Sequence, residues 1–274
     1  MEKKRVLHVS QANVPFLPTS EIGETAKRLA QGVQESGKEI RVFMPRFGCI
    51  NERRHQLHEV IRLSGMNLII DDTDHPLIIK VASIPSARMQ VYFIDNEEFF
   101  KRKATLKDEN GDDFEDNDER SMFFCRGVLE TVKKLGWKPD VIHCHGSLTS
   151  MMPMYVKDVY KNDPHFSDSK VVTSLYNEDV NKIWDKRFDE KLNFEGFNND
   201  VVGNITSGDH VSLLKQAVNF SDGVVIGSEE LDESLASIVS DAKKETLEFS
   251  EIEAQAKLLS DFYDKVIEEE VLVD

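Results

Sequence analysis

Apolar residues in the first part of the chain form short runs, and these alternate with stretches in which apolar positions recur at helical spacing. Val6–Ser10 is rich in valine and predicts a buried strand. Residues 21–35 carry apolar side chains every three or four positions and stop before Gly37, which predicts a helix. Ile40–Met44 then predicts a second strand, ended by Pro45. Two parallel strands joined by a helix form a unit with a right-handed crossover.

The region from residue 56 to residue 95 has a different pattern. Three short β-type runs, Leu68–Ile70, Leu77–Val81 and Met89–Ile94, are separated by acidic or proline-containing turns. Runs of this length bounded by turn residues predict a strand pair or meander. We expect it to be inserted into the α/β pattern.

The alternation resumes after residue 116. Arg120–Leu135 predicts a helix with Asn117 or Asp118 as its cap and Gly136 as its stop. Further strands are predicted at 140–145, 170–175 and 222–227, and further helices at 149–160 and 211–220. The fold class that follows is α/β, with a doubly wound, mostly parallel sheet.

The segment from Glu229 onward is predicted to be helical throughout, with a possible break near Ser240. Ile252, Leu259 and Val266 recur every seven residues, with Phe262 between the last two, and form an amphipathic stripe. Such a helix packs on its own sheet or docks a protein partner, and both interpretations stay open. The predicted organisation is a domain over residues 1–240 and an acidic helical tail over residues 241–274.

The charge of the chain limits its partners. The net charge is −16, and residues 228–274 hold 15 acidic side chains and 4 lysines, so 11 of the 16 net negative charges lie there. Nucleic acids and anionic membranes attract basic surfaces, so we expect neither as a partner. No run is long enough for a signal peptide or a membrane span, and three cysteines without a CxxC pair favour a reducing compartment. We expect a cytoplasmic protein.

The loop after the first predicted strand is the first candidate site, because ligands of open parallel sheets bind at the carboxyl ends of strands. The sequence contains no GxGxxG and no Walker A motif. Ser20 can cap the following helix, and Glu21 and Glu24 lie in its first turn. Carboxylates are favoured at a helix N-terminus and repel a phosphate from it.

Two other segments contain possible metal ligands. His143 and His145 lie two apart at a strand end and point to one face, but no further ligand is spaced nearby, so a histidine lining a cleft is expected instead. In the acidic segment 108–119, Gly111 is in the fourth position, whereas a calcium-binding EF-hand loop needs glycine in the sixth. We expect no metal and no cofactor.

Several segments, in order, resemble the N-terminal half of bacterial glycogen and starch synthases. The matching segments are Val6–Ser10 with Pro15–Phe16, Arg41–Gly48, Phe93–Asn96 with Glu98–Phe100, Asp116–Arg120 with Phe123–Phe124 and Leu129–Glu130, Lys138–His145, and, more weakly, Leu214–Lys215 through Ser228. The resemblance covers residues 4–240.

The resemblance implies one Rossmann-like half of a GT-B glycosyltransferase and a reaction that moves glucose from ADP-glucose to an α-1,4-glucan. It implies substrate contacts at Ser10, Thr19, Asn117 and His145, with His145 as the catalytic candidate. The chain is expected to lack the second Rossmann-like domain. The family's first loop, K-T-G-G-L, contains the lysine that meets the donor phosphates, and Pro18–Ile22 align there.

The predicted function is therefore a glycogen or starch synthase-like protein, weak or inactive as a lone chain. Tyr176 stands where the family has a histidine, and Gly146–Ser147 replace its Asp-Trp. The alternative is a non-catalytic glucan-binding protein, or a scaffold or regulatory protein, derived from that family. ADP-glucose, an α-glucan, or a protein bound through residues 241–274 are the expected partners.

Overall fold

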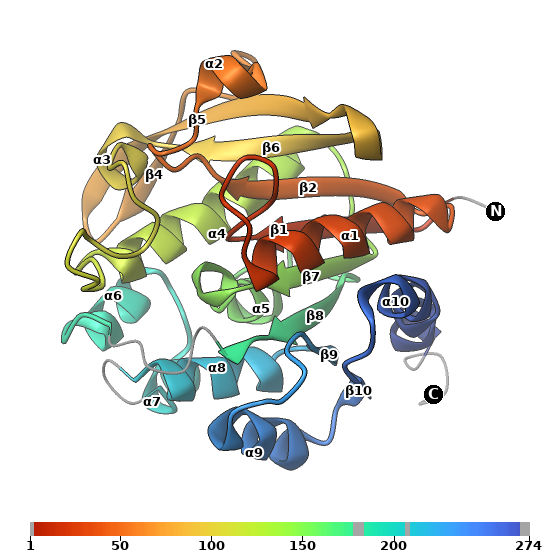
Figure 1. Ribbon diagram of the computed structural model, residues 1–274. Helices are drawn as coiled ribbons and strands as arrows, with labels where there is room; N and C mark the ends of the chain where they lie inside the picture. Colours follow the sequence, from red (N-terminus) through yellow and green to blue (C-terminus); the bar gives the residue numbers. More distant parts are fainter. Residues whose placement is uncertain (1–2, 178–183, 206–208, 269–274) are drawn as a thin grey trace.

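A central, mostly parallel sheet organises the molecule (Figure 1). The computed structural model describes residues 3–177, 184–205 and 209–268. Within them the strand order is β10-β9-β8-β7-β1-β2-β6-β5-β3, and β4 pairs with β5. Neighbouring strands run parallel from β10 to β6, and the pairs made by β5 are antiparallel. The predicted doubly wound α/β class is confirmed.

The opening unit forms as the apolar pattern predicts. Strand β1 (Arg5–Ser10) lies beside β2 (Glu39–Pro45), and helix α1 (Glu21–Glu35) connects them. The Ser20 side chain accepts a hydrogen bond from the Gly23 amide at 3.1 Å, which confirms Ser20 as the helix cap. Gly37 after the helix has φ +97°, a conformation that favours glycine.

The predicted insertion is an antiparallel set at one edge of the sheet. It contains β3 (His58–Glu59), β4 (Met66–Ile70), β5 (Thr73–Ile84) and β6 (Met89–Asp95), with the short helices α2 (Glu52–His55), η1 (Pro85–Ala87) and α3 (Glu97–Phe100). Strand β6 pairs with β5 on one side and with β2 on the other. It therefore joins the insertion to the parallel part of the sheet.

The second half continues the alternation. Strands β7 (Val141–His145), β8 (Lys170–Leu175) and β9 (Gly223–Ile226) follow one another across the sheet. The remaining elements between them are α4 (Asn117–Lys134), η2 (Ser147–Thr149), α5 (Met152–Met154), η3 (Tyr155–Val159), α6 (Phe188–Phe194), α7 (Asn199–Gly203) and α8 (His210–Asn219). None of the helices in the described part of the chain has the length and apolar character needed to cross a membrane.

The start of α4 differs from the prediction. Asn117 and Asp118 already lie inside the helix, and Asp116 occupies the cap position without a side-chain capping bond. The Asn117 amide instead donates to the Leu106 carbonyl at 2.9 Å and accepts from the Arg120 guanidinium at 2.7 Å. The Asn117 side chain therefore forms hydrogen bonds with the preceding loop and with its own helix.

The segment after Glu229 is helical with a break close to the position expected near Ser240, but the prediction of helix throughout is wrong because a strand follows the break. Helix α9 (Glu233–Ala242) is followed by β10 (Glu245–Leu247), which pairs with β9, and then by α10 (Ile252–Glu268). The Lys243 backbone ends α9 in the left-handed region, with φ +50°. The predicted amphipathic helix is present from residue 252, and residues 269–274 lie outside the described part.

The apolar stripe of α10 packs on the same sheet that carries the rest of the fold. Leu259, Phe262, Tyr263 and Val266 are buried in one cluster with residues of α1 and of β1, β7, β8 and β9. Figure 1 shows α10 beside α1. Lys38 strengthens the contact, since its ammonium donates to Ser260 at 2.8 Å and to Asp264 at 2.9 Å. The structure thus favours packing of this stripe within the chain. The side chain of Ile252 is not among those that the structure describes.

Candidate functional site

The strand order reverses at β1, since β2 lies on one side of it and β7 on the other. The carboxyl ends of β1 and β7 therefore open into the crevice where ligands of doubly wound sheets bind. The segments that follow them cover residues 11–20 and 146–151, and Gln11, Ala12 and Leu17–Ser20 of the first segment line a pocket. The candidate site lies here.

Gln11 joins these two segments. Its backbone N–H donates to the His145 carbonyl at 3.0 Å, and its side-chain oxygen accepts from the Ser147 hydroxyl at 3.0 Å. Gly146 has φ +89°, and a β-carbon added there would lie 2.4 Å from the Gln11 side chain. A residue with a β-carbon at position 146 would be strained by the positive φ and would displace the Gln11 side chain.

The N-terminus of α1 is occupied by side chains of this chain. Ser20 caps it, and the Glu21 carboxylate in its first turn accepts a hydrogen bond from the Ser228 hydroxyl at 2.9 Å. The Ser228 oxygen in turn accepts from the Asn177 amide at 3.3 Å. A contact between residues 207 positions apart therefore joins the loop after β1 to the segments after β8 and β9.

His145 is placed more deeply than the sequence predicts. It does not line a cleft, because it is fully buried and its Nδ1 is 2.9 Å from the Tyr176 hydroxyl. Burial, together with the neighbouring His8, holds the pKa of His145 well below its usual range. Tyr176 is itself buried against Gly227, where an added β-carbon would lie 2.4 Å from the ring. At neutral pH His145 is a neutral ring beneath the crevice.

The other predicted contact residues have two kinds of surroundings. Ser10 and Asn117 form hydrogen bonds with loop carbonyls, and Thr19 lines a pocket. Ser10 is buried, and its hydroxyl donates to the Ala12 carbonyl at 2.6 Å, which shapes the turn after β1. Thr19 lines a pocket of about 490 Å³ beside this turn. The Asn117 side chain donates a hydrogen bond to the carbonyl of Leu106, which lines the opposite wall of that pocket. The four predicted residues thus surround one region, and only Thr19 among them lines the pocket.

The pocket also contains residues that sequence reasoning missed. Its lining combines apolar, hydroxyl, amide and lysine side chains from three separate loops: Gln11, Ala12, Leu17–Ser20, Phe47, Cys49 and Lys103–Lys107. Ligand pockets of this size commonly pair an apolar floor with a few polar groups. The position of these loops after strand ends was the available signal, but no local motif marks Gln11 or residues 103–107.

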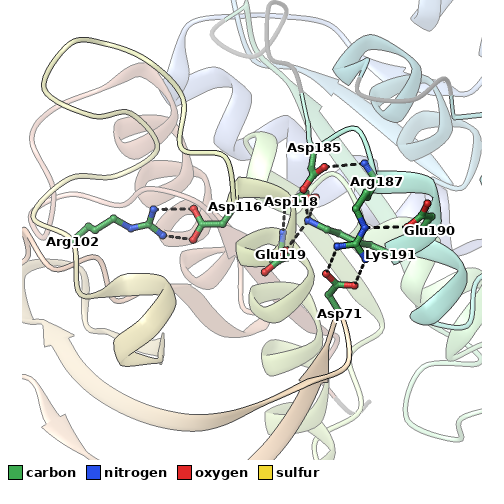
Figure 2. A network of polar contacts seen from close by, with 9 residues as sticks. All are labelled: Asp71, Arg102, Asp116, Asp118, Glu119, Asp185, Arg187, Glu190 and Lys191. Atoms are coloured by element: carbon green, nitrogen blue, oxygen red, sulfur yellow. Dashed lines mark hydrogen bonds and ion pairs between the residues drawn. The ribbon is translucent and has the colours of Figure 1, made fainter.

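Ion pairs hold the pocket wall and the neighbouring helix in place (Figure 2). Arg102 pairs with Asp116, which ties the loop over residues 101–116 to the start of α4. The acidic segment that follows Lys107 folds on itself, since Asp108 accepts from the Asn110 and Asp112 amides. This is the predicted acidic loop leading into a helix.

Lys191 of α6 is the centre of the network in Figure 2. Its ammonium is 2.9 Å from Asp118, 2.6 Å from Glu119 and 2.9 Å from Asp185, and its side chain is 1% exposed. Arg187 extends the network at the surface, where it contacts Asp71 at 3.0 Å. Burial raises the pKa of Asp118 to about 6 despite the lysine. We refer to Lys191, Asp118, Glu119 and Asp185 as the lysine cluster.

Comparisons with known proteins agree on one family. Residues 5–243 match the family model described as the starch synthase catalytic domain. The chain is 36% identical over 219 residues to the glycogen synthase of Chlorobium limicola, covering 80% of this chain and 44% of that protein. It is 38% identical over 174 residues to the glycogen synthase of Chlorobaculum tepidum, covering 63% and 36%. The chain therefore spans less than half the length of these relatives.

A solved structure shows the same fold. The catalytic domain of starch synthase IV from Arabidopsis thaliana, bound to ADP and acarbose, superimposes with a TM-score of 0.71 at 20% identity. The match covers 90% of this chain and 51% of that one, which corresponds to one half of a GT-B glycosyltransferase. From the family model, the sequence relatives and this fold it follows that the chain belongs to the glycogen and starch synthase family and represents the N-terminal part of its catalytic domain.

Proposed function

We propose that this domain binds an α-1,4-glucan in the pocket beside β1 and does not hold the phosphates of ADP-glucose in the family's manner. The observation that carries the proposal is the Glu21 carboxylate, fixed to Ser228 at the N-terminus of α1. The resemblance implies a loop with a lysine and two glycines at that point, whereas this chain has Pro18 in place of the lysine and the Glu21 carboxylate at the start of the helix.

The electrostatics at α1 support the first part of the argument. A helix N-terminus attracts anions through its free amides and its dipole. Here Ser20 accepts the hydrogen bond of the Gly23 amide, and Glu21 and Glu24 already supply negative charge. Pro18 aligns with the family's phosphate-binding lysine and brings neither a charge nor an amide hydrogen. A diphosphate approaching this loop is repelled.

The pocket supports the second part. Leu17 and Phe47 supply apolar surface for a sugar face, and Gln11, Thr19 and Thr105 supply groups that can pair with hydroxyls. Among the described residues, the pocket lining contains no carboxylate, and Lys103 and Lys107 add donors at its rim. The apolar, hydroxyl and amide groups of this lining match a ligand with many hydroxyl groups. The Arabidopsis relative was solved with acarbose as well as ADP, which agrees with saccharide recognition by the fold.

Calorimetry of the purified chain against maltoheptaose, ADP and ADP-glucose tests the proposal. We expect binding of maltoheptaose and no measurable heat with either nucleotide. Thr19→Val with Thr105→Val should weaken maltoheptaose binding, and Thr73→Val, at an exposed site outside the pocket lining, is the matched control. Micromolar binding of ADP-glucose by the unaltered chain would overturn the assignment.

A gain of function sharpens the test. Pro18→Lys combined with Glu21→Gly restores the charge and the open backbone that the resemblance implies. We expect this double variant to bind ADP more tightly than the unaltered chain, because the lysine adds attraction and the glycine removes the carboxylate. If ADP binding stays absent while maltoheptaose binding is kept, Glu21 is not what excludes the nucleotide.

A further inference from the structure

Three histidines from two neighbouring strands meet under the crevice. The register of β1 and β7 pairs His8 with His143 and Ser10 with His145, and all three rings lie on the face of the sheet that α10 covers. Ring centroids are 4.0 Å apart for His143 and His145, 5.6 Å for His8 and His143, and 5.8 Å for His8 and His145. One nitrogen from each ring lies within 4.8 Å of the others. We refer to His8, His143 and His145 as the histidine cluster.

Two of these rings have nitrogens without a partner. In the described part of the chain, neither nitrogen of His8 has a hydrogen-bond partner, and Nε2 of His145 has none. All three side chains are fully buried, so bulk water does not satisfy them. Buried polar atoms in native proteins are nearly always paired, and each exception calls for an explanation such as an ion.

The partners of the remaining nitrogens resemble the supports of a metal site. The Tyr176 hydroxyl lies 2.9 Å from Nδ1 of His145 and leaves Nε2 for a ligand bond. Tyr263 lies 2.6 Å from Nδ1 of His143, and Ser174 lies 2.8 Å from its Nε2. Metal-ligating histidines usually hold a second group through the other ring nitrogen, which fixes the ring. Both ring nitrogens of His143 contact a hydroxyl group, so one of these two contacts has to break before His143 can bind the ion.

The chemistry of the donor set suits the same role. Each of the three residues offers one imidazole nitrogen, and a neutral imidazole nitrogen has the free lone pair that a metal requires. The group contains no carboxylate, so a borderline cation that accepts nitrogen ligands fits better than Mg²⁺ or Ca²⁺.

We propose that His8, His143 and His145 form a buried site for a divalent transition-metal ion of the zinc class. Nitrogens bonded to one tetrahedral Zn²⁺ at about 2.0–2.1 Å lie about 3.3 Å apart, so the rings must close by a small rotation. The ion would link β1 to β7 at the centre of the sheet. Through Tyr263 it would also stabilise the packing of α10. The site is distinct from the proposed glucan pocket, whose lining contains none of the three histidines.

Metal titration of the whole chain, made without an affinity tag, tests the site. The protein is unfolded in chelator, refolded with Zn²⁺ or Co²⁺, and freed of excess metal. We expect one ion per chain, a visible Co²⁺ absorption spectrum, and a higher thermal midpoint with Zn²⁺ than in the refolded metal-free protein. The proposal is overturned if the unaltered chain retains no ion and its thermal midpoint does not shift. This outcome does not depend on any variant.

Two variants locate the ion. His8→Phe keeps a ring in the core and removes the two nitrogens without partners, so it should lose the Co²⁺ spectrum and the Zn²⁺ shift while circular dichroism shows that it folds. His58→Gln changes an exposed histidine outside the cluster and should retain both. If His8→Phe retains one ion per chain with the same spectrum, the metal is bound elsewhere and the assignment is wrong.

Discussion

The lysine cluster at the start of α4 and the histidine cluster under α10 bury polar groups in two different ways. The first pairs opposite charges, since one ammonium faces three carboxylates. The second avoids charge, since burial keeps three imidazoles neutral. Buried ion pairs are costly to break by removing one partner, whereas neutral buried groups cost mainly their missing hydrogen bonds. The two clusters should therefore respond in opposite directions to acid.

Removing the lysine should have the largest effect. Lys191→Met leaves Asp118 fully buried beside two further carboxylates, so we expect a loss of about 3–5 kcal/mol in the free energy of unfolding. Urea denaturation at pH 7 measures it. Lys186→Met, at an exposed position in the same segment, is the control and should change the free energy little. Equal losses of unfolding free energy in both variants would show that Lys191 contributes no more to stability than an exposed lysine.

Acid should destabilise the histidine cluster in the metal-free protein. The pKa of His8 is about 3 when folded, below its ordinary 6.5, so its contribution is complete above pH 6.5 and is lost as the pH falls towards 3. His8→Phe should make the decline in unfolding free energy shallower by about 1.4 kcal/mol per pH unit in that range. Urea denaturation from pH 7 to pH 4.5 measures both slopes. Identical slopes would mean that His8 is protonated in the folded state.

Acid should have the opposite effect at Asp118. Its pKa is about 6 when folded, above the ordinary 3.8, so its contribution is complete below pH 3.8 and is lost as the pH rises through 6. The stability of the unaltered chain relative to Asp118→Asn should therefore increase by about 1–2 kcal/mol between pH 7 and pH 5. Paired urea titrations at the two pH values measure this difference. A decrease would show that the ion pair with Lys191 outweighs burial.

The surface part of the network should have the smallest effect. Arg187 is 55% exposed where it contacts Asp71, and exposed ion pairs contribute little and are screened by salt. Arg187→Ala should shift the urea midpoint far less than Lys191→Met, and the shift should shrink further in 1 M salt. A salt-insensitive loss would indicate that Arg187 holds α6 by packing instead of by charge.

The sequence predicted the elements whose patterns are local. The alternation of short apolar runs and helical spacing located β1, α1 and β2 correctly because a strand or helix needs only neighbouring residues to show its period. Strand β10 was missed because its three residues, Glu-Thr-Leu, lie between two acidic helical stretches and carry no period of their own. Its pairing with β9 is what makes it a strand.

The candidate site was less predictable because its contacts join distant residues. His143 and His145 were noticed as a pair, but His8 came from another strand, and only the β1–β7 register brings it to them. Glu21 was recognised at a helix N-terminus, whereas its bond to Ser228 depends on the whole sheet. Nothing near Lys191 in the sequence indicates Asp118 as its partner. The family resemblance supplied candidate residues, and the tertiary structure shows the contacts that each of them makes.

The packing of α10 on α1 has a consequence for how the protein folds. Lys38 and Asp264, which join the two regions, are 226 positions apart. Contacts between such distant residues form late, because a long loop must close before they contribute. During synthesis the first strand and helix leave the ribosome long before the helix that covers them exists. Until then their apolar face is open to chaperones, and completion of the core should follow synthesis of residues 252–268.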